Sequence, residues 1–448
     1  MRRLRQLAER TPAGRERYVD LLRALAITMV VLGHWGITVI THDRAGRPSG
    51  HSALGDLPWV WPLTWVAQVM PVFFLVGGFA NAASLTAHRA RGGDPTGWLV
   101  DRSARLVRPT TALLVVLAAG ATVAWLRHAD PTQIRTAAWF ATIPLWFLVA
   151  YLVVVPLTPP MYALHRRFGL AVPAVLVGLV ALGDLGRLLG PEALATGNYL
   201  FGWLAVHQIG FAWYDTRDPD TPRRRRLPLT RRAGALLLAA GLVLLVLLTV
   251  VGPYPVVMLN VPGERLDNAA PPSLALLAAA TAQLGLLLLL RGPAERWLRR
   301  CRPWQAVIAV NAVVLTVFLW HLTAAILLIG LLDALGVLPT PTVGTAAWWA
   351  WRVPWLLALA VMLSALVAVF GPIEARSRRS RTRDAPSTPW RTVLAAAGYG
   401  GVVAGLLVNS LTGKTAAEPL GLPAPALLAY LAGAGLLRLL RSGWGSRG

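Results

Sequence analysis

Twelve stretches of roughly 20 mostly apolar residues dominate this chain, and each is long enough to cross the hydrocarbon core of a bilayer. Of the 448 residues, 56% are hydrophobic and 14% are charged, which is more apolar surface than a soluble domain can bury. We therefore predict an all-α polytopic membrane protein with about 12 transmembrane helices. The predicted spans are 19–40, 64–87, 109–126, 137–156, 170–189, 198–214, 233–251, 273–290, 305–330, 347–370, 392–411 and 423–440.

Basic residues are distributed unevenly between the loops that join these spans. With the N-terminus placed inside, the inside segments carry 34 of the 43 lysines and arginines, and the outside loops carry seven. Cytoplasmic loops are enriched in such residues, so the alternation supports twelve spans with both termini in the cytoplasm. Of the basic residues only Lys414 is a lysine, a bias that suggests a bacterial genome rich in G and C, and hence a bacterial inner membrane.

Four regions follow from this arrangement. Residues 1–17 form a basic cytoplasmic segment, and 18–370 form a membrane domain of ten spans. Residues 371–391 are predicted to be an arginine-rich cytoplasmic linker, and 392–448 to hold two additional spans and a cytoplasmic tail. The arginine run at 223–226 fits an orientation signal beside anionic lipid, so no nucleic-acid partner is expected.

Ionisable residues in the first predicted span are the clearest candidates for chemistry, because such groups are costly in a bilayer and usually functional. Arg23 and His34 are eleven residues apart, so on a regular helix they share a face about 16 Å apart. Asp20 lies three residues before Arg23 and can pair with it. A desolvated imidazole tends to stay neutral and can act as a general base. We predict a catalytic group of Asp20, Arg23 and His34.

A second cluster opens the third predicted span. Arg102, Arg105 and Arg108 recur at three-residue spacing and share a helix face. Arginine binds phosphate with two parallel hydrogen bonds, so the three can hold a nucleotide-bearing donor, although ordinary loop charge explains the spacing equally well. Held there, an acyl-coenzyme A would present its thioester near His34. Cys301 is the only cysteine and no His-Glu-x-x-His motif occurs, so no metal is expected.

Several motifs occur in a set order along residues 18–370. They are Asp20-x-x-Arg23 with His34, residues 70–79, Arg105-x-x-Arg108-Pro109, residues 144–148, His207-Gln208, and Phe318-Leu319-Trp320-His321. Together they resemble the acyltransferase-3 family of integral membrane acyltransferases. Leu21, Gly77 and the Leu319-Trp320 pair differ from that family's usual residues.

This resemblance implies transfer of an acyl group, often acetyl, from cytosolic acyl-CoA to a hydroxyl of a glycan, lipid or small-molecule acceptor. In the family the residues matching Arg23, His34, Arg105 and Arg108 are needed for activity. A further set is expected to line the pore or the substrate site, although a structural hydrogen bond explains His207 and His321 equally well. This set is Trp146, His207, Gln208 and His321.

Two alternatives stay open. Twelve spans with both termini inside also suit a secondary transporter or permease, but such proteins are commonly built from repeated halves and no repeat is visible. The second alternative is an exporter of acyl groups or glycans within the same family, which would use the pore without the chemistry.

Overall fold

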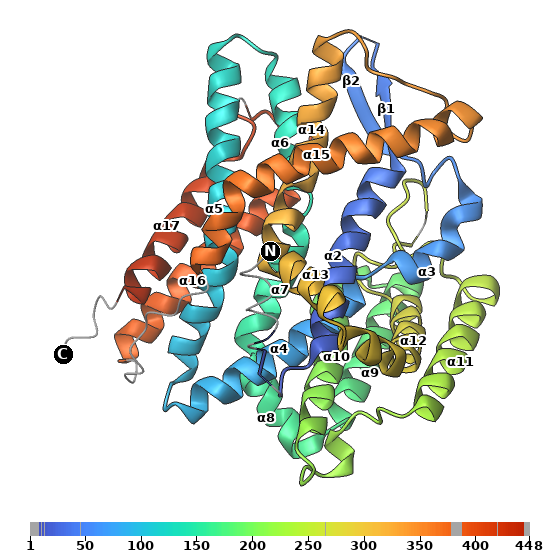
Figure 1. Cartoon of the computed structure of the whole chain (residues 1–448), viewed down its shortest axis with the longest axis vertical. Helices are drawn as coiled ribbons and strands as arrows, with labels where there is room; N and C mark the ends of the chain where they lie inside the picture. Colours follow the sequence, from blue (N-terminus) through green and yellow to red (C-terminus); the bar gives the residue numbers. More distant parts are fainter. Residues whose placement is uncertain are drawn as a thin grey trace.

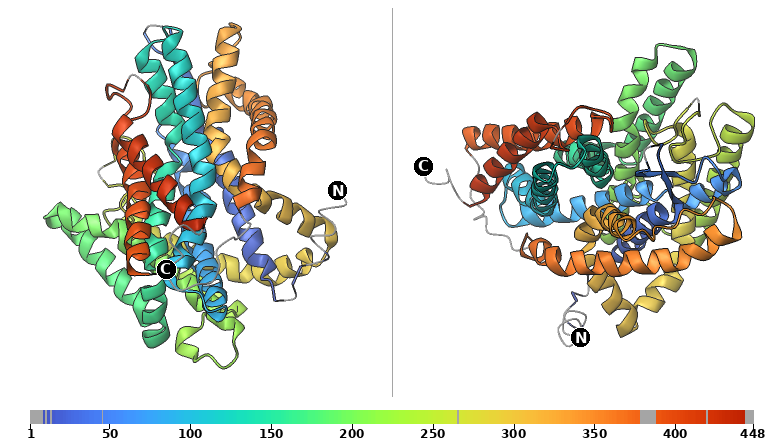
Figure 2. Two further views of the ribbon diagram at one scale, coloured as in Figure 1. Left: turned by 90° about the vertical axis from the view of Figure 1, so that its left-hand side faces the viewer. Right: turned by 90° about the horizontal axis from the view of Figure 1, so that it is seen from above.

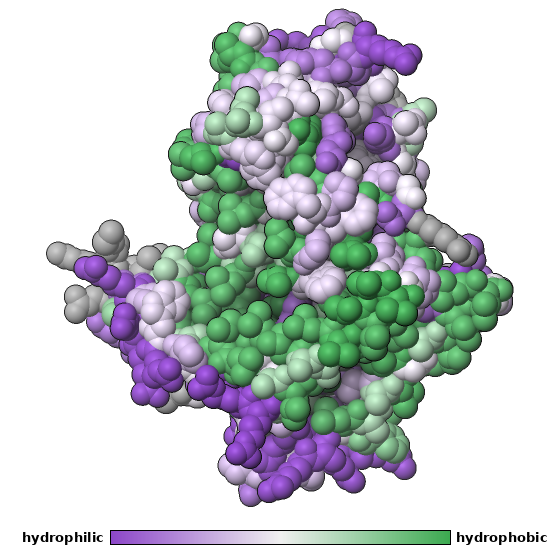
Figure 3. All heavy atoms as spheres, turned by 90° about the vertical axis from the view of Figure 1, so that its right-hand side faces the viewer, coloured by the Kyte–Doolittle hydropathy of each residue, from purple (hydrophilic) through white to green (hydrophobic). Residues whose placement is uncertain are grey.

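The computed structural model describes residues 9, 11–12, 14–44, 46–264, 266–377, 388–418 and 420–442 (Figure 1). Within these residues, eleven helical segments are long and apolar enough to cross a membrane. Figure 3 shows a broad band of apolar side chains between two polar ends on one face of the molecule. The chain is therefore a multi-pass membrane protein. The eleven segments are Arg17–Ile37, Pro58–Ala90, Pro95–Leu126, Leu145–Phe168, Ala171–Leu189, Arg231–Val251, Leu274–Leu298, Val314–Ala334, Ala346–Ala375, Pro389–Leu411 and Ala424–Arg441.

The elements that the text uses follow one another in chain order. They are α2 (Arg17–Ile37), β1 (Thr38–His42), β2 (Pro48–Ser52), α3 (Thr64–Ala67), α4 (Met70–Ala90), α5 (Pro95–Leu126), α6 (Pro131–Thr142), α7 (Leu145–Val154), α8 (Thr158–Phe168), α9 (Ala171–Leu189), α10 (Asn198–Tyr214), α11 (Arg231–Val246), α12 (Leu274–Leu298), α13 (Cys301–Ala312), α14 (Val314–Ala334), α15 (Ala346–Ser377), α16 (Pro389–Leu411) and α17 (Ala424–Arg441).

The sixth predicted span is present as a helix but is short. It was predicted over 198–214 and coincides with α10, whose 17 residues fall below the roughly 20 that cross a bilayer at right angles. The third predicted span, 109–126, begins earlier than expected because α5 starts at Pro95 and runs for 32 residues. The arginine cluster therefore lies within the helix and not at its opening.

Three predicted spans are interrupted by short non-helical breaks. The breaks fall at Gln68–Val69 between α3 and α4, at Ile143–Pro144 between α6 and α7, and at Val313 between α13 and α14. Proline explains the second break, because it lacks the N–H that would continue the helix. Val313 has φ −128° and ψ 18°, outside the helical region.

A short β-hairpin, which the all-α prediction missed, follows α2. Strands β1 and β2 pair antiparallel from Thr38 opposite Ser52 to His42 opposite Pro48. The first predicted span therefore ends at Ile37 and not at residue 40. The hairpin lies at one end of the molecule (Figure 1), and we call this the hairpin end. We call the opposite end of α2, where Arg23 lies, the arginine end.

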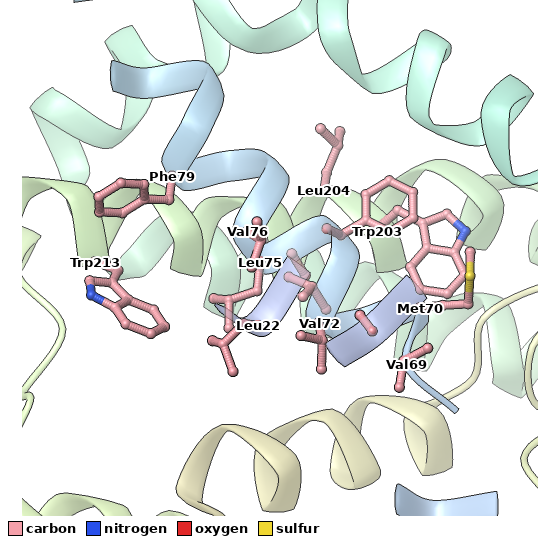
Figure 4. Close-up of a cluster of buried hydrophobic side chains, with 14 of the residues drawn as sticks. Leu22, Val69, Met70, Val72, Leu75, Val76, Phe79, Trp203, Leu204 and Trp213 are labelled. Carbon is pink, nitrogen blue, oxygen red and sulfur yellow. The ribbon is translucent and has the colours of Figure 1, made fainter. Parts of the chain in front are cut away.

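Close contact between α4 and α10 forms the centre of the main core (Figure 4). A Cβ on Gly78 would lie 2.0 Å from the carbonyl oxygen of His207, and one on Gly210 would lie 2.2 Å from that of Leu75. Small residues let two helix backbones approach in this way. Beside them Phe74 and Trp203 stack with ring centroids 4.6 Å apart.

The last two helices pack into the membrane domain. Helices α16 and α17 lie side by side next to α5 (Figure 2). The Tyr399 hydroxyl donates to the carbonyl of Leu152 at 2.6 Å, and the Tyr430 hydroxyl donates to that of Val107 at 2.9 Å. The preceding helix α15 continues to Ser377, so it occupies the start of the predicted linker 371–391. Residues 378–387 of that linker lie outside the described residues.

Arg135 ties α6 to the loop between α16 and α17. Its side chain is buried, and it donates to the carbonyls of Gly421 at 2.7 Å, Thr412 at 2.6 Å and Gly413 at 3.0 Å.

We expect Arg135→Leu to lower the free energy of unfolding by about 2 kcal/mol or more, because buried carbonyls lose charged donors. Thermal unfolding of the protein in detergent measures this. Exposed Arg127→Leu is the control, and equal melting temperatures for both variants would contradict the prediction.

Candidate functional site

A cavity of about 670 Å³ lies at the arginine end, and basic side chains dominate its charge. Residues from α2, α4, α5, α7, α13, α14 and α15 line it. Five arginines and three carboxylates are among the lining residues. They are Arg15, Arg23, Arg102, Arg105, Arg217, Glu16, Asp20 and Glu374. The cavity is large enough for a small-molecule ligand, and its excess of arginine favours an anion.

Asp20 orients the two arginines nearest to it. Its Oδ1 accepts from Arg23 at 3.1 Å, and its Oδ2 accepts from Nε of Arg15 at 2.6 Å. Asn311 braces this group from α13, because its Nδ2 donates to the Asp20 carbonyl at 2.8 Å and its Oδ1 lies 3.5 Å from Arg23. The predicted pairing of Asp20 with Arg23 is therefore present in the fold, with Arg15 as a second partner.

A series of hydrogen-bonded polar side chains holds the guanidinium group of Arg102 in place. Arg102 donates to the Tyr151 hydroxyl at 3.0 Å, and this hydroxyl donates to Oδ1 of Asn81 at 3.3 Å. Nδ2 of Asn81 lies 3.0 Å from Nε2 of His207, so it donates to that ring nitrogen. Because Asn81 and His207 are fully buried, this series fixes where the guanidinium of Arg102 points.

The two remaining carboxylates of the cavity, Glu16 and Glu374, belong to a set of three that the five arginines outnumber. Glu374 accepts from the backbone N–H of Thr316 at 2.8 Å and that of Leu315 at 3.3 Å, so it satisfies donors at the start of α14. Burial raises the pKa of the Glu16 carboxyl above its ordinary value, although the nearby Arg291 opposes that shift. The arginines therefore set the sign of the potential.

A second cavity of about 310 Å³ lies at the hairpin end, and His34 lines it. Its walls come from α2, the hairpin region, the break before α4, the start of α7 and the start of α15. Trp146, which the sequence analysis expected at a substrate site, also lines this cavity.

His34 is held by a second histidine on α14. Its Nδ1 lies 2.7 Å from Nε2 of His321, and Nδ1 of His321 lies 2.6 Å from the carbonyl oxygen of Phe318. A carbonyl only accepts, so His321 carries its proton on Nδ1 and its Nε2 accepts from Nδ1–H of His34. In two neutral rings, Nε2 of His34 is left with a lone pair. Among the described residues this atom has no hydrogen-bond partner.

Two phenylalanines lie between the cavities. Phe147 and Phe318 line both of them, and their ring centroids are 5.5 Å apart. Phe73 extends the aromatic group, with its centroid 5.3 Å from that of Phe147. Arg23 lines the arginine-end cavity and His34 lines the hairpin-end cavity, so these phenylalanines border the cavities of both residues.

The other residues expected from the sequence lie away from these cavities. Arg108 is exposed on α5 and does not line either cavity, unlike Arg102 and Arg105. His207 and Gln208 are fully buried. Nε2 of His207 accepts from Asn81, and the Gln208 amide donates to the Met161 carbonyl at 3.1 Å. His321 is also fully buried and reaches the cavity only through His34.

Several site residues were missed by the sequence analysis. They are Asn81, Tyr151, Asn311, Glu374, Phe147 and Arg15. The amides carried a signal, because an uncharged polar residue in an apolar helix needs a partner. Phe147 lies within the quoted motif 144–148 but was not singled out, since an aromatic residue in a span is ordinary.

Comparison with known protein families assigns the chain to one of them. A family model described as an acyltransferase domain, that of the acyltransferase-3 family, matches residues 16–373, and the chain belongs to this family. No curated protein and no solved structure matches this chain. The match covers the hairpin-end cavity and the lining of the arginine-end cavity except Gly14, Arg15 and Glu374, and it ends before α16 and α17. The protein is thus a membrane acyltransferase by family.

The histidine pair makes a spectroscopic prediction. We expect the ring ¹⁵N signals of both His34 and His321 to show a protonated Nδ1 and an unprotonated Nε2, because the Phe318 carbonyl fixes the direction of both hydrogen bonds. NMR of protein labelled at histidine nitrogens measures this, with His34→Gln and His321→Gln to assign the signals. A His34 ring protonated on Nε2 alone would contradict the arrangement.

Proposed function

We propose that this protein transfers an acyl group, acetyl in size, from acyl-CoA to a hydroxyl group, with His34 as the general base. The observation that carries this is that His34 lines a cavity while its Nδ1 is held by His321, which leaves a lone pair on Nε2. An imidazole oriented through its other nitrogen is a competent base for a hydroxyl proton. The family membership supports the reaction class.

The arginine-end cavity is the proposed donor site. Its five arginines can bind the phosphates of coenzyme A, with Arg102 and Arg105 on one face of α5. Arg108 is proposed as an outer contact, since it lies one turn along the same helix. Arg23 and Asp20 line this site, and along α2 the separation of Arg23 and His34 is about 16 Å. The pantetheine arm would extend past Phe147 and Phe318 to cross that distance.

The reaction then balances without any other group. The acceptor oxygen attacks the thioester carbonyl as Nε2 of His34 takes the hydroxyl proton, and the new ester C–O bond forms. The C–S bond breaks, and the thiolate of coenzyme A takes the proton from His34. His321 stabilises the transient imidazolium through the hydrogen bond at Nδ1.

We also propose that the arginine end faces the cytoplasm of a bacterial inner membrane, with both chain termini on that side. The excess of arginine in the predicted inside loops supports this orientation. Cytosolic acyl-CoA would then enter at the arginine end, and a glycan, lipid or small-molecule acceptor would enter from the hairpin end.

A second function is favoured by one observation, the aromatic group that separates two cavities. This arrangement also suits an exporter that moves its cargo past Phe147 and Phe318. Release of free coenzyme A from acetyl-CoA in the presence of an acceptor separates the two, because an exporter leaves the thioester intact.

Removing the proposed base should abolish product formation. We expect His34→Gln to lower acyl transfer at least 100-fold, the scale on which general bases contribute. Mass spectrometry of envelope glycans, lipids and secreted metabolites from cells with the wild-type gene, the variant or no gene measures the added acyl mass. His128→Gln serves as a comparison, because His128 is exposed and lines neither cavity, and the amount of each protein in the membrane is measured in parallel. Full acylation by His34→Gln would refute the role.

Removing a cavity arginine should weaken donor binding. We expect Arg102→Ala and Arg105→Ala each to raise the Kd for coenzyme A tenfold or more, because each loses a charge-assisted contact to phosphate. Isothermal titration of the purified protein with coenzyme A gives the Kd. Arg89→Ala is the matched control, since Arg89 is exposed at the end of α4 and does not line the cavity. Equal affinity in all three variants would show that the phosphates bind elsewhere.

A further inference from the structure

The hairpin-end cavity is almost wholly apolar. Its lining includes aliphatic and aromatic side chains from several distant parts of the chain, and no charged side chain among the described residues lines it. Two lining residues other than His34 and the tryptophans have polar side chains. Both are used within the protein, because Thr64 Oγ1 donates to the Trp61 carbonyl at 2.5 Å and Gln68 Nε2 donates to the Met258 carbonyl at 3.0 Å.

The side chains that line this cavity offer too few hydrogen-bond partners for the hydroxyl groups of a sugar. Each hydroxyl buried without a partner costs roughly 1–3 kcal/mol, and a sugar carries several. Besides Nε2 of His34, the side-chain groups that remain for a ligand are the indole N–H groups of Trp146, Trp348 and Trp349, which donate but do not accept. The cavity can therefore hold one hydroxyl group on an apolar body.

Two glycines keep the space beside His34 open. Gly33 and Gly36 line the cavity, and a Cβ on either would meet no atom within 4 Å. Gly78 and Gly210 are different, because their missing side chains let two helix backbones touch. Glycine within a helix costs roughly 0.5–1 kcal/mol relative to alanine. At Gly33 and Gly36, no close backbone contact in the described chain offsets the cost of a helical glycine. The missing side chains instead leave volume in the cavity.

Part of the cavity wall is open to the surface. Leu63 is 62% exposed and Trp349 is 45% exposed, and both line the cavity. Exposed apolar side chains on a membrane protein contact lipid, so an apolar molecule dissolved in the bilayer can reach His34 along this wall.

Resting on the proposed function, we propose that the acceptor is an apolar alcohol, a hydroxyl on a hydrocarbon body, that binds in the hairpin-end cavity over Gly33 and Gly36. The donor occupies the arginine-end cavity, which leaves the hairpin-end cavity to the acceptor. The hydroxyl donates its proton to Nε2 of His34, its oxygen forms the ester with the acyl carbon, and coenzyme A leaves as the thiol.

The test uses the full chain in lipid nanodiscs with acetyl-CoA as donor. Dodecanol, farnesol and methyl glucoside are compared as acceptors, by release of the coenzyme A thiol and by mass spectrometry of the ester. We expect at least one of the two apolar alcohols to be esterified at least tenfold faster than the sugar. Faster esterification of methyl glucoside would overturn the inference and leave the acyltransferase function standing. Absence of any ester and of any thiol release, with coenzyme A still bound, would overturn both.

A cavity-filling variant supplies the second arm. We expect Gly33→Leu to slow esterification of the long alcohol at least tenfold, Gly33→Ala to slow it less, and a shorter alcohol such as butanol to recover activity in Gly33→Leu. The control is Gly120→Leu, because Gly120 also meets no atom within 4 Å but is exposed on α5 away from both cavities. No dependence on alcohol length would overturn the inference.

Two further measurements complete the test. The first detects binding of the alcohol without catalysis, and the second distinguishes an acceptor in this cavity from the acyl chain of the donor. A long-chain alcohol carrying a diazirine should crosslink to α2 near Gly33 in the wild-type protein and lose that label in Gly33→Leu. Octanoyl-CoA is compared with acetyl-CoA in the same variant. If the loss in Gly33→Leu followed the length of the acyl chain and not that of the alcohol, the cavity would hold the donor's chain and the inference would be wrong.

Discussion

The bilayer requires every backbone N–H and C=O to find a partner inside the protein, and the architecture of this chain depends on that requirement. Long helices meet it, and irregular backbone at membrane depth is tolerated where it is buried in protein or lines a cavity. The three helix breaks follow this rule. Gln68 and Pro144 line the hairpin-end cavity, while Asn311 and Val314 beside the third break line the arginine-end cavity. The breaks therefore mark the places where the fold makes room for a ligand.

The two cavities differ in chemistry although they share the Phe147 and Phe318 side chains. One is rich in arginine, and buried polar residues such as Tyr151 and Asn311 hold the guanidinium groups in place. The other is apolar around a single oriented imidazole. A charged, soluble donor and an apolar acceptor would each find a suitable environment and meet between them. This division follows from the electrostatics of the lining side chains.

The helices that carry the site also explain why it is rigid. Trp35 on α2 donates from its indole to the carbonyl of His321 at 2.9 Å, so α2 and α14 are joined by a second hydrogen bond beside the histidine pair. Glu374 on α15 binds the start of α14. Groups held from two sides keep their geometry, which general base catalysis and phosphate binding both need.

The sequence by itself determined the membrane class, the family and the approximate place of most of the long helices, because apolar length and ordered motifs are local properties of the chain. It also placed Asp20 beside Arg23, a contact within one helical turn. Tertiary structure alone decided that His34 pairs with His321, since 287 residues separate them and only the packing of α2 on α14 sets the distance. It likewise decided that Arg102 faces a cavity while Arg108 does not, and that Gly33 borders open space. Those outcomes depend on neighbours from distant segments, which no local pattern specifies.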